Sequence, residues 1–139
     1  MGQKVNPVGF RLGTSRDHDS IWFAKSKDYS KLVLQDLKIR KRVKEILPQA
    51  PISAVVIKRT MEEVIVDIKT SRPGIVIGKK GEEIEKIKSE LKKVVKQDVK
   101  LNVVEVKQPD LDAQLVADSV TQQLELSLIH ISEPTRQVL

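Results

Sequence analysis

The strongest signal in this chain of 139 residues is Ile75-Val76-Ile77-Gly78-Lys79-Lys80-Gly81, followed directly by Glu82-Glu83-Ile84. It is a G-x-x-G loop that follows a β-branched run and leads into an amphipathic helix. Because glycine has no Cβ, the two glycines permit unusual backbone angles and let the main chain approach a sugar-phosphate strand closely. The motif alone is common, so the surrounding sequence has to support it. The candidate nucleic-acid-binding residues of the loop are Gly78, Lys79, Lys80 and Gly81.

Three strands are predicted from runs rich in β-branched residues, two before the loop and one after it. In the second strand, Val64, Val66 and Ile68 alternate with charged residues, which predicts one buried and one exposed face. The predicted strands are Ile52–Lys58, Glu63–Thr70 and Val99–Val106.

Helices are predicted over residues 29–47 and 82–97, where apolar residues recur at helical spacing. The first has Asp28 or Ser30 as its expected N-cap. A last helix opens at Pro109, with Asp110 as its expected N-cap. The predicted order is therefore helix, strand, strand, a short helix before the loop, the G-x-x-G loop, helix, strand and helix.

Composition excludes several classes of function. With 40% hydrophobic and 32% charged residues, the chain is typical of a soluble globular protein, and no apolar run approaches the ~20 residues of a membrane span. It has no cysteine, and its two histidines, His18 and His130, lack a zinc-ligand spacing. A P-loop is excluded because only three residues separate Gly74 from Gly78 and Lys80 replaces the magnesium-binding Ser or Thr. We expect no catalytic residues, metal, cofactor, small-molecule substrate or membrane association.

The net charge of +6 and the isoelectric point near 9.6 indicate a polyanionic partner. Through Gln97 there are 22 Lys and Arg against 12 Asp and Glu, whereas from Asp98 onward there are 3 against 7. Five basic residues lie within seven positions of the first predicted helix. Cations there complement the helix dipole, but five exceed that need and favour an RNA-facing surface. The candidate RNA-binding residues outside the loop are Arg72, Lys38, Arg40, Lys41 and Arg42.

Residues 1–28 are predicted to form a basic arm, because they carry five Lys and Arg and show no helix or strand period. Such arms commonly become ordered on RNA, so Lys4 and Arg11 are also candidate RNA-binding residues. The aromatic residues of the arm have two interpretations: they stack on bases, or they pack against their own domain. These residues are Phe10, Trp22 and Phe23.

The predicted order, with an extra helix and strand before a β-α-α-β unit, resembles a type II KH domain. The resemblance implies an α+β fold with a three-stranded mixed sheet, helices on one face, and a loop that clamps a nucleic-acid backbone. Several separate motifs also resemble the bacterial branch of the third small-subunit ribosomal protein family. These motifs are Met1–Pro7, Gly9–Gly13, Asp36–Arg40, Arg72–Gly74, Asn102–Val106 and Leu111–Ala117.

This resemblance implies a structural component of the small ribosomal subunit that binds rRNA in the head, near the side where mRNA enters. The implied partners are small-subunit rRNA, mRNA near the entry channel and other head proteins. The implied location is a ribosome in the cytoplasm or in an organelle. The alternative is a free-standing KH RNA-binding module or an assembly factor. A nucleic-acid enzyme such as a lysine-dependent lyase is a further alternative, although no lysine stands in an evident activating constellation.

The resemblance ends at Glu125. The family continues there with an arginine-rich segment and a second α/β domain, whereas Leu126–Arg136 looks like the translation of a transposase-type sequencing adapter. The expected organisation is a basic arm at 1–28, a type II KH domain at 29–110, the start of a helix leading to a missing C-terminal domain at 111–125, and a non-native tail at 126–139.

Overall fold

The structure, a computed structural model, describes residues 2–48 and 50–138, with the side chains of residues 2–48 and 50–127. Within these residues, a four-stranded sheet has the order β1-β2-β3-β4. β2 (Ile52–Arg59) and β3 (Glu63–Thr70) are antiparallel, whereas β4 (Asp98–Glu105) runs parallel to β3 and β1 (Ser20–Ile21) runs parallel to β2. The sheet is mixed, as predicted. It has a fourth strand in addition to the predicted three, because two residues of the predicted arm pair with its edge.

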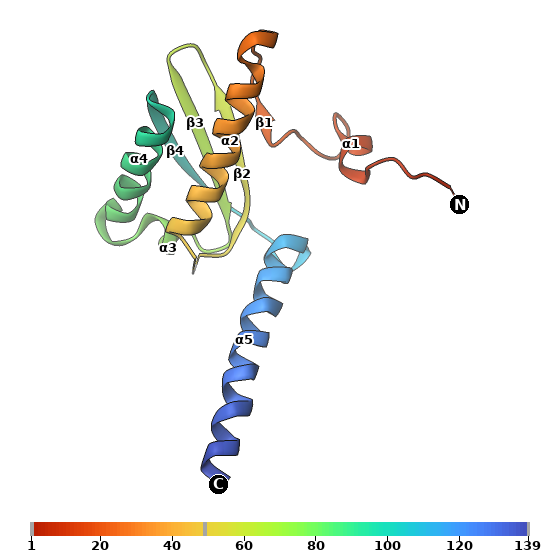
Figure 1. The fold of residues 1–139 in the computed structure, drawn as a ribbon, viewed down its shortest axis with the longest axis vertical. Coiled ribbons are helices and arrows are strands. Elements are labelled where there is room, and N and C mark those ends of the chain that lie inside the picture. Colours follow the sequence, from red (N-terminus) through yellow and green to blue (C-terminus); the bar gives the residue numbers. More distant parts are fainter. Residues whose placement is uncertain (1, 49, 139) are drawn as a thin grey trace.

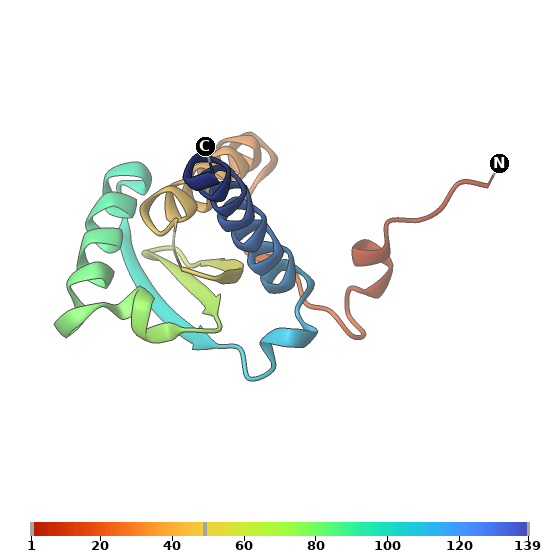
Figure 2. The same cartoon turned by 90° about the horizontal axis from the view of Figure 1, so that it is seen from below.

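Two long helices, α2 (Ser26–Ile46) and α4 (Glu82–Val95), cover one face of the sheet (Figures 1 and 2). Each turns an apolar stripe toward the sheet, and the alternate residues of β3 meet these stripes. The helical periods and the alternation predicted from the sequence are both confirmed. The largest fully buried apolar side chains of this core are Ile39, Val43, Ile57, Val64, Val66, Ile68, Val76, Ile87, Leu91 and Val99.

The opposite face of the sheet carries charged and polar cross-strand pairs beside the apolar Val56, Ile65 and Val104. Lys100 on β4 lies 2.9 Å from a carboxylate oxygen of Glu63 on β3, and Asn102 Nδ2 donates to Asp67 Oδ1 at 3.0 Å. Lys69 is exposed on β3. Cross-strand pairs of this kind stabilise a solvated sheet face modestly.

The start of α2 differs from the prediction. The helix begins at Ser26, with Lys25 as N-cap, and among the described residues no side chain caps it. Asp28 and Ser30 lie inside the first turns, so the prediction that one of them is the N-cap was wrong. Asp28 still complements the positive end of the helix dipole.

The last helix, α5 (Ala113–Val138), follows a 3-10 turn, η2 (Pro109–Leu111). Asp112 caps it, and the prediction of Asp110 was therefore wrong. Asp112 Oδ1 accepts from the N–H of Gln114 at 3.0 Å, and Oδ2 accepts a hydrogen bond from Ser53 Oγ on β2. The hydrogen bond from Ser53 is the main cause that lowers the pKa of Asp112, opposed by desolvation. A side chain on β2 thus holds the carboxylate that caps α5.

The predicted arm contains a second short element, α1 (Pro7–Arg11), which lies away from the sheet (Figures 1 and 2). Asn6 Oδ1 accepts from the N–H of Val8 at 2.9 Å, and Pro7 occupies the first turn. The structure therefore places two short elements, α1 and β1, in a segment whose sequence shows no period.

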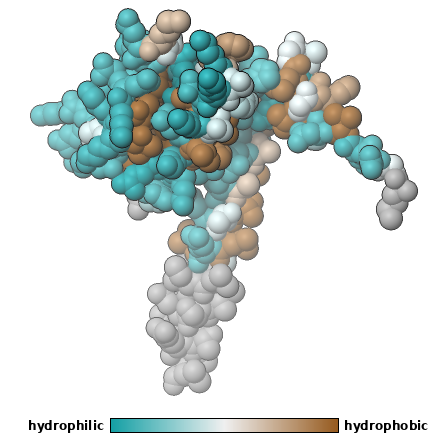
Figure 3. All heavy atoms as spheres, turned by 45° about the horizontal axis from the view of Figure 1, so that its top comes forward, coloured by the Kyte–Doolittle hydropathy of each residue, from teal (hydrophilic) through white to brown (hydrophobic). Residues whose placement is uncertain are grey.

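α5 extends away from the sheet (Figure 1). Figure 3 shows apolar side chains on α5 and on the arm, and along α5 the exposed ones include Val116, Val120 and Leu124. None of the helices in the described part of the chain is long and apolar enough to cross a membrane. The prediction of a non-native tail at 126–139 concerns mainly side chains outside the described residues, and it stays a prediction.

Candidate nucleic-acid interface

The G-x-x-G loop joins α3 (Pro73–Ile77) to α4. Gly78 has φ 69° and ψ −171°, a backbone region that is essentially restricted to glycine. Lys80, with φ 54°, and Gly81, with φ 76°, follow in the left-handed region. This succession of positive φ values forms a sharp, open turn on which Lys79 and Lys80 are both exposed.

Gly78 is also needed for steric reasons. A Cβ on Gly78 would lie 2.5 Å from Cγ of Glu83 and 3.3 Å from the Glu83 backbone nitrogen. At Gly81, by contrast, none of the described residues comes within 4 Å of such a Cβ. Gly78 therefore supplies both the turn and the space for the Glu83 side chain, whereas Gly81 supplies only the turn.

A groove of about 690 Å³ lies beside the loop. Its walls come from the end of α2 and the segment after it, from α3 and the loop, and from the first turn of α4. Five of its ten lining residues have apolar side chains and the loop contributes Gly78 and Lys79, an arrangement that suits bases against the apolar side chains and phosphates at the loop. The lining residues are Ile46, Leu47, Pro48, Ala50, Gly74, Ile75, Gly78, Lys79, Glu82 and Glu83.

The predicted basic residues outside the loop and the arm fall into two groups. Arg72 is exposed and is the N-cap of α3, so it lies next to the groove-lining end of that helix. Lys38 and Lys41 are exposed on α2. These three residues can extend the basic surface beyond the loop.

Arg40 and Arg42 have partners inside the protein. Arg40 Nη2 donates to Ser20 Oγ at 2.8 Å and so holds β1. Arg42 Nη2 donates to Glu90 on α4 at 2.8 Å, and this hydrogen bond is the main cause that raises the pKa of Arg42 and lowers that of Glu90. These two arginines thus connect α2 to β1 and to α4, in addition to any RNA contact predicted for them.

The arm residues Lys4 and Arg11 lie apart from the loop. Both are exposed, and Arg11 Nη1 donates to the carbonyl oxygen of Pro7 at 3.1 Å, within α1. Because α1 lies away from the sheet, the structure does not bring Lys4 and Arg11 together with the G-x-x-G loop (Figure 1).

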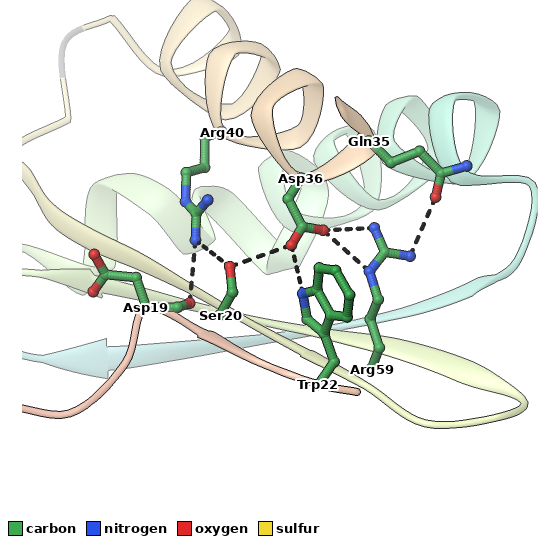
Figure 4. A network of polar contacts seen from close by, with 7 residues as sticks. All are labelled: Asp19, Ser20, Trp22, Gln35, Asp36, Arg40 and Arg59. Atoms are coloured by element: carbon green, nitrogen blue, oxygen red, sulfur yellow. Dashed lines mark hydrogen bonds and ion pairs between the residues drawn. The ribbon is translucent and has the colours of Figure 1, made fainter. Parts of the chain in front are cut away.

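Sequence reasoning missed a buried polar network centred on Asp36 of α2 (Figure 4). Asp36 is 2% exposed and accepts hydrogen bonds from Trp22 Nε1 at 2.6 Å, from Ser20 Oγ at 3.2 Å and from Arg59 Nη2 at 2.6 Å. One signal could have revealed it: Asp36 is a charged residue within the apolar stripe that continues at Ile39, three residues later. The network ties β1 to α2 and β2.

The same network decides the role of one aromatic residue. The Trp22 ring packs against Tyr29, with ring centroids 5.3 Å apart, and the Arg59 guanidinium lies 5.8 Å above it. Trp22 therefore packs against its own domain. Phe10 and Phe23, by contrast, are 74% and 94% exposed, and they remain the aromatic side chains of the arm that are available to a partner.

In the part of the chain that the structure describes, no group of three His, Cys, Asp or Glu side chains could hold a metal ion. The groove itself offers backbone, lysine, carboxylate and apolar groups for contacts with a ligand.

Comparisons with known proteins agree with this geometry. The chain is 51% identical over 125 residues to small ribosomal subunit protein uS3 of Maricaulis maris, covering 90% of this chain and 53% of that protein. It is 50% identical to uS3 of Magnetococcus marinus, covering 90% and 59%, and 52% identical over 124 residues to uS3 of Pelagibacter ubique, covering 89% and 55%. The chain spans slightly more than half the length of these relatives.

The family model of the KH domain matches residues 38–111. This stretch contains the second half of α2, the strands β2, β3 and β4, and the G-x-x-G loop with both flanking helices. The matched region is more than half of the chain, and it includes the groove. The chain therefore belongs to the KH-domain family, with the α+β architecture of the type II form, and it is similar over 90% of its length to proteins named uS3.

Proposed function

We propose that this chain is a noncatalytic RNA-binding component of the small ribosomal subunit that holds single-stranded RNA in the groove beside its G-x-x-G loop. The observation that carries the proposal is the loop itself, with three positive φ values and two exposed lysines beside a groove that has five apolar side chains in its lining. The names of the relatives, which are those of a small-subunit ribosomal protein, support the ribosomal part.

In this proposal the phosphates lie at the loop. Lys79 and Lys80 provide positive charge there, and the glycines let the main chain come close to the strand. Glu82 and Glu83, in the first turn of α4, oppose phosphate binding at the helix N-terminus itself. The backbone of the RNA is therefore held by the loop, and its bases lie toward the apolar side chains of the groove.

The wider contacts are proposed from the basic surface and from the relatives. Arg72, Lys38 and Lys41 extend the positive surface beyond the groove. The arm, with Lys4 and Arg11, wraps small-subunit rRNA. The proposed position is the head of the subunit near the side where mRNA enters, with rRNA, mRNA and other head proteins as partners, in a cytoplasmic or organellar ribosome.

Reversing the two loop lysines tests the proposal. The variant Lys79→Asp with Lys80→Asp should bind a single-stranded rRNA fragment more weakly, because two phosphate contacts are lost. The plot of log affinity against log salt concentration has a negative slope, and its magnitude should decrease by about 1.4, since each contact on a single strand contributes about 0.7. Fluorescence anisotropy titrations at several salt concentrations measure both quantities.

The matched control is Lys69→Glu with Lys88→Glu, which makes the same change in charge at exposed positions on β3 and α4 outside the groove lining. It should change the slope much less. Equal affinity and equal slope in the loop variant and the wild type would remove the loop from the proposed mechanism. Cosedimentation with small subunits is the second readout, and RNA binding without cosedimentation would favour the free-standing KH module.

A further inference from the structure

The groove contains two carboxylates that phosphate binding does not explain. Of the described residues that line it, three are charged, namely Lys79, Glu82 and Glu83, and the others are apolar or glycine. A carboxylate beside a phosphate-binding loop repels phosphate, so it weakens the grip on the RNA backbone. Both lie in the first turn of α4, where a carboxylate stabilises the positive end of the helix dipole. A carboxylate that lines the groove can in addition accept hydrogen bonds from the part of the ligand that carries donors, which is the base.

Glu83 is the better placed of the two. Its Cγ occupies the space that a Cβ on Gly78 would need, so the absence of that Cβ is what allows the side chain to lie against the loop. Among the described residues Glu83 has one ion pair, with Lys86, whose Nζ lies 3.8 Å from Glu83 Oε1; this is too far for a hydrogen bond, so both carboxylate oxygens keep their acceptor capacity. The carboxylate thus offers two acceptor oxygens at the loop end of the groove.

We propose that Glu83 makes the groove select guanine, by accepting hydrogen bonds from N1–H and N2–H of a single base. This inference rests on the proposed function and names the base that the same site takes. A carboxylate presents two parallel acceptors, and guanine is the nucleobase whose Watson–Crick edge carries two adjacent N–H donors. Unpaired bases are commonly recognised on this edge by RNA-binding proteins.

The other bases fit the carboxylate less well. Adenine and cytosine each place one amino group beside an acceptor nitrogen, and uracil places one N–H between two carbonyl oxygens. Each of them turns an acceptor toward one carboxylate oxygen, which costs free energy because two acceptors repel. The apolar side chains of the groove contribute about equally to all four bases, since they offer no hydrogen bond that would distinguish them. Discrimination therefore depends on Glu83.

The test changes one hydrogen-bond donor on the RNA and one acceptor on the protein. The RNA is a uridine ten-mer with a single central guanosine or, in its place, inosine, which lacks the N2 amino group. The wild-type chain should bind the guanosine strand about tenfold more tightly, as expected for a lost half of a bidentate pair. For Glu83→Ala the two strands should bind within about twofold of one another.

Glu85→Ala is the matched control, because Glu85 also lies in the first turn of α4 but does not line the groove. It removes the same charge near the same helix end and should keep the tenfold preference. Equal binding of the two strands by the wild type, or a preference that Glu83→Ala retains, would overturn the role of Glu83 and leave the proposed RNA binding intact. If the wild type binds neither strand nor the rRNA fragment, the proposed function fails together with this inference.

Discussion

Replacing Asp36 with alanine is expected to lower the free energy of unfolding by about 3–5 kcal/mol, because it breaks a buried ion pair and leaves one charge without its partner. The Arg59 and Asp36 side chains are 7% and 3% exposed, and Arg59 Nη2 lies 2.6 Å from Asp36 Oδ1. Trp22 Nε1 and Ser20 Oγ lose the same acceptor. Urea unfolding followed by circular dichroism measures the loss.

The cost should come from the orphaned groups rather than from the missing attraction. The double variant Asp36→Leu with Arg59→Met should therefore recover part of the stability. Two apolar side chains of similar volume can pack in the buried site and leave no charge without a partner. Asp110→Ala, at an exposed position in η2, is the control and should change stability by less than about 0.5 kcal/mol. A loss below about 1 kcal/mol in Asp36→Ala would show that the network does not hold β1 to the domain.

Replacing Gly78 with alanine is expected to reduce RNA affinity at least tenfold. The φ of 69° with ψ of −171° costs a residue with a Cβ about 1–3 kcal/mol, and the new methyl group also has to displace Glu83 from 2.5 Å. The loop therefore rearranges, and the lysines and the carboxylate lose their positions together. Anisotropy titration with the rRNA fragment measures the affinity, and thermal unfolding shows whether the fold persists.

Gly74→Ala is the control for this variant. Gly74 also lines the groove, but it lies in α3, and a Cβ there meets none of the described residues within 4 Å. It should be at least as stable as the wild type, because alanine is the better helix former, and it should lose far less affinity than Gly78→Ala, because no positive φ has to change. If Gly78→Ala and Gly74→Ala bind RNA equally well, the unusual backbone of Gly78 has no part in binding.

The features that sequence reasoning predicted correctly are those whose cause lies within a few residues. The alternation of Val64, Val66 and Ile68 requires a strand with one buried face, and all three are fully buried. The two loop glycines were predicted to permit unusual backbone angles, and both have positive φ. The G-x-x-G loop could therefore be located from the sequence alone.

The features that were missed depend on residues far apart in the chain. The cap of α5 is Asp112 because Ser53, 59 residues away, bonds to its carboxylate. β1 has only two residues and owes its place to Asp36 and Arg40, neither of which is its neighbour in sequence. No local period encodes such contacts, so the prediction of an unstructured arm could not contain them.

The same reason limits the prediction of the basic cluster on α2. The count of cations was correct, but the sequence does not show which of them face a carboxylate. Arg42, for example, donates a hydrogen bond to Glu90, which lies 48 residues away in the sequence. The exposed lysines Lys38 and Lys41 are therefore the better candidates for RNA contact within this cluster, whereas Arg40 and Arg42 also hold the fold.

The decisive measurement is a heteronuclear NMR titration of the chain with the single-stranded rRNA fragment, read as changes in backbone amide shifts. The account predicts the largest changes in Gly74–Glu83 and at Ile46 and Leu47, which line the groove, with little change at Lys69 and Lys100 on the opposite face of the sheet. Changes confined to that opposite face or to the arm, with the loop unaffected, would contradict the claim that RNA lies in the groove beside the G-x-x-G loop.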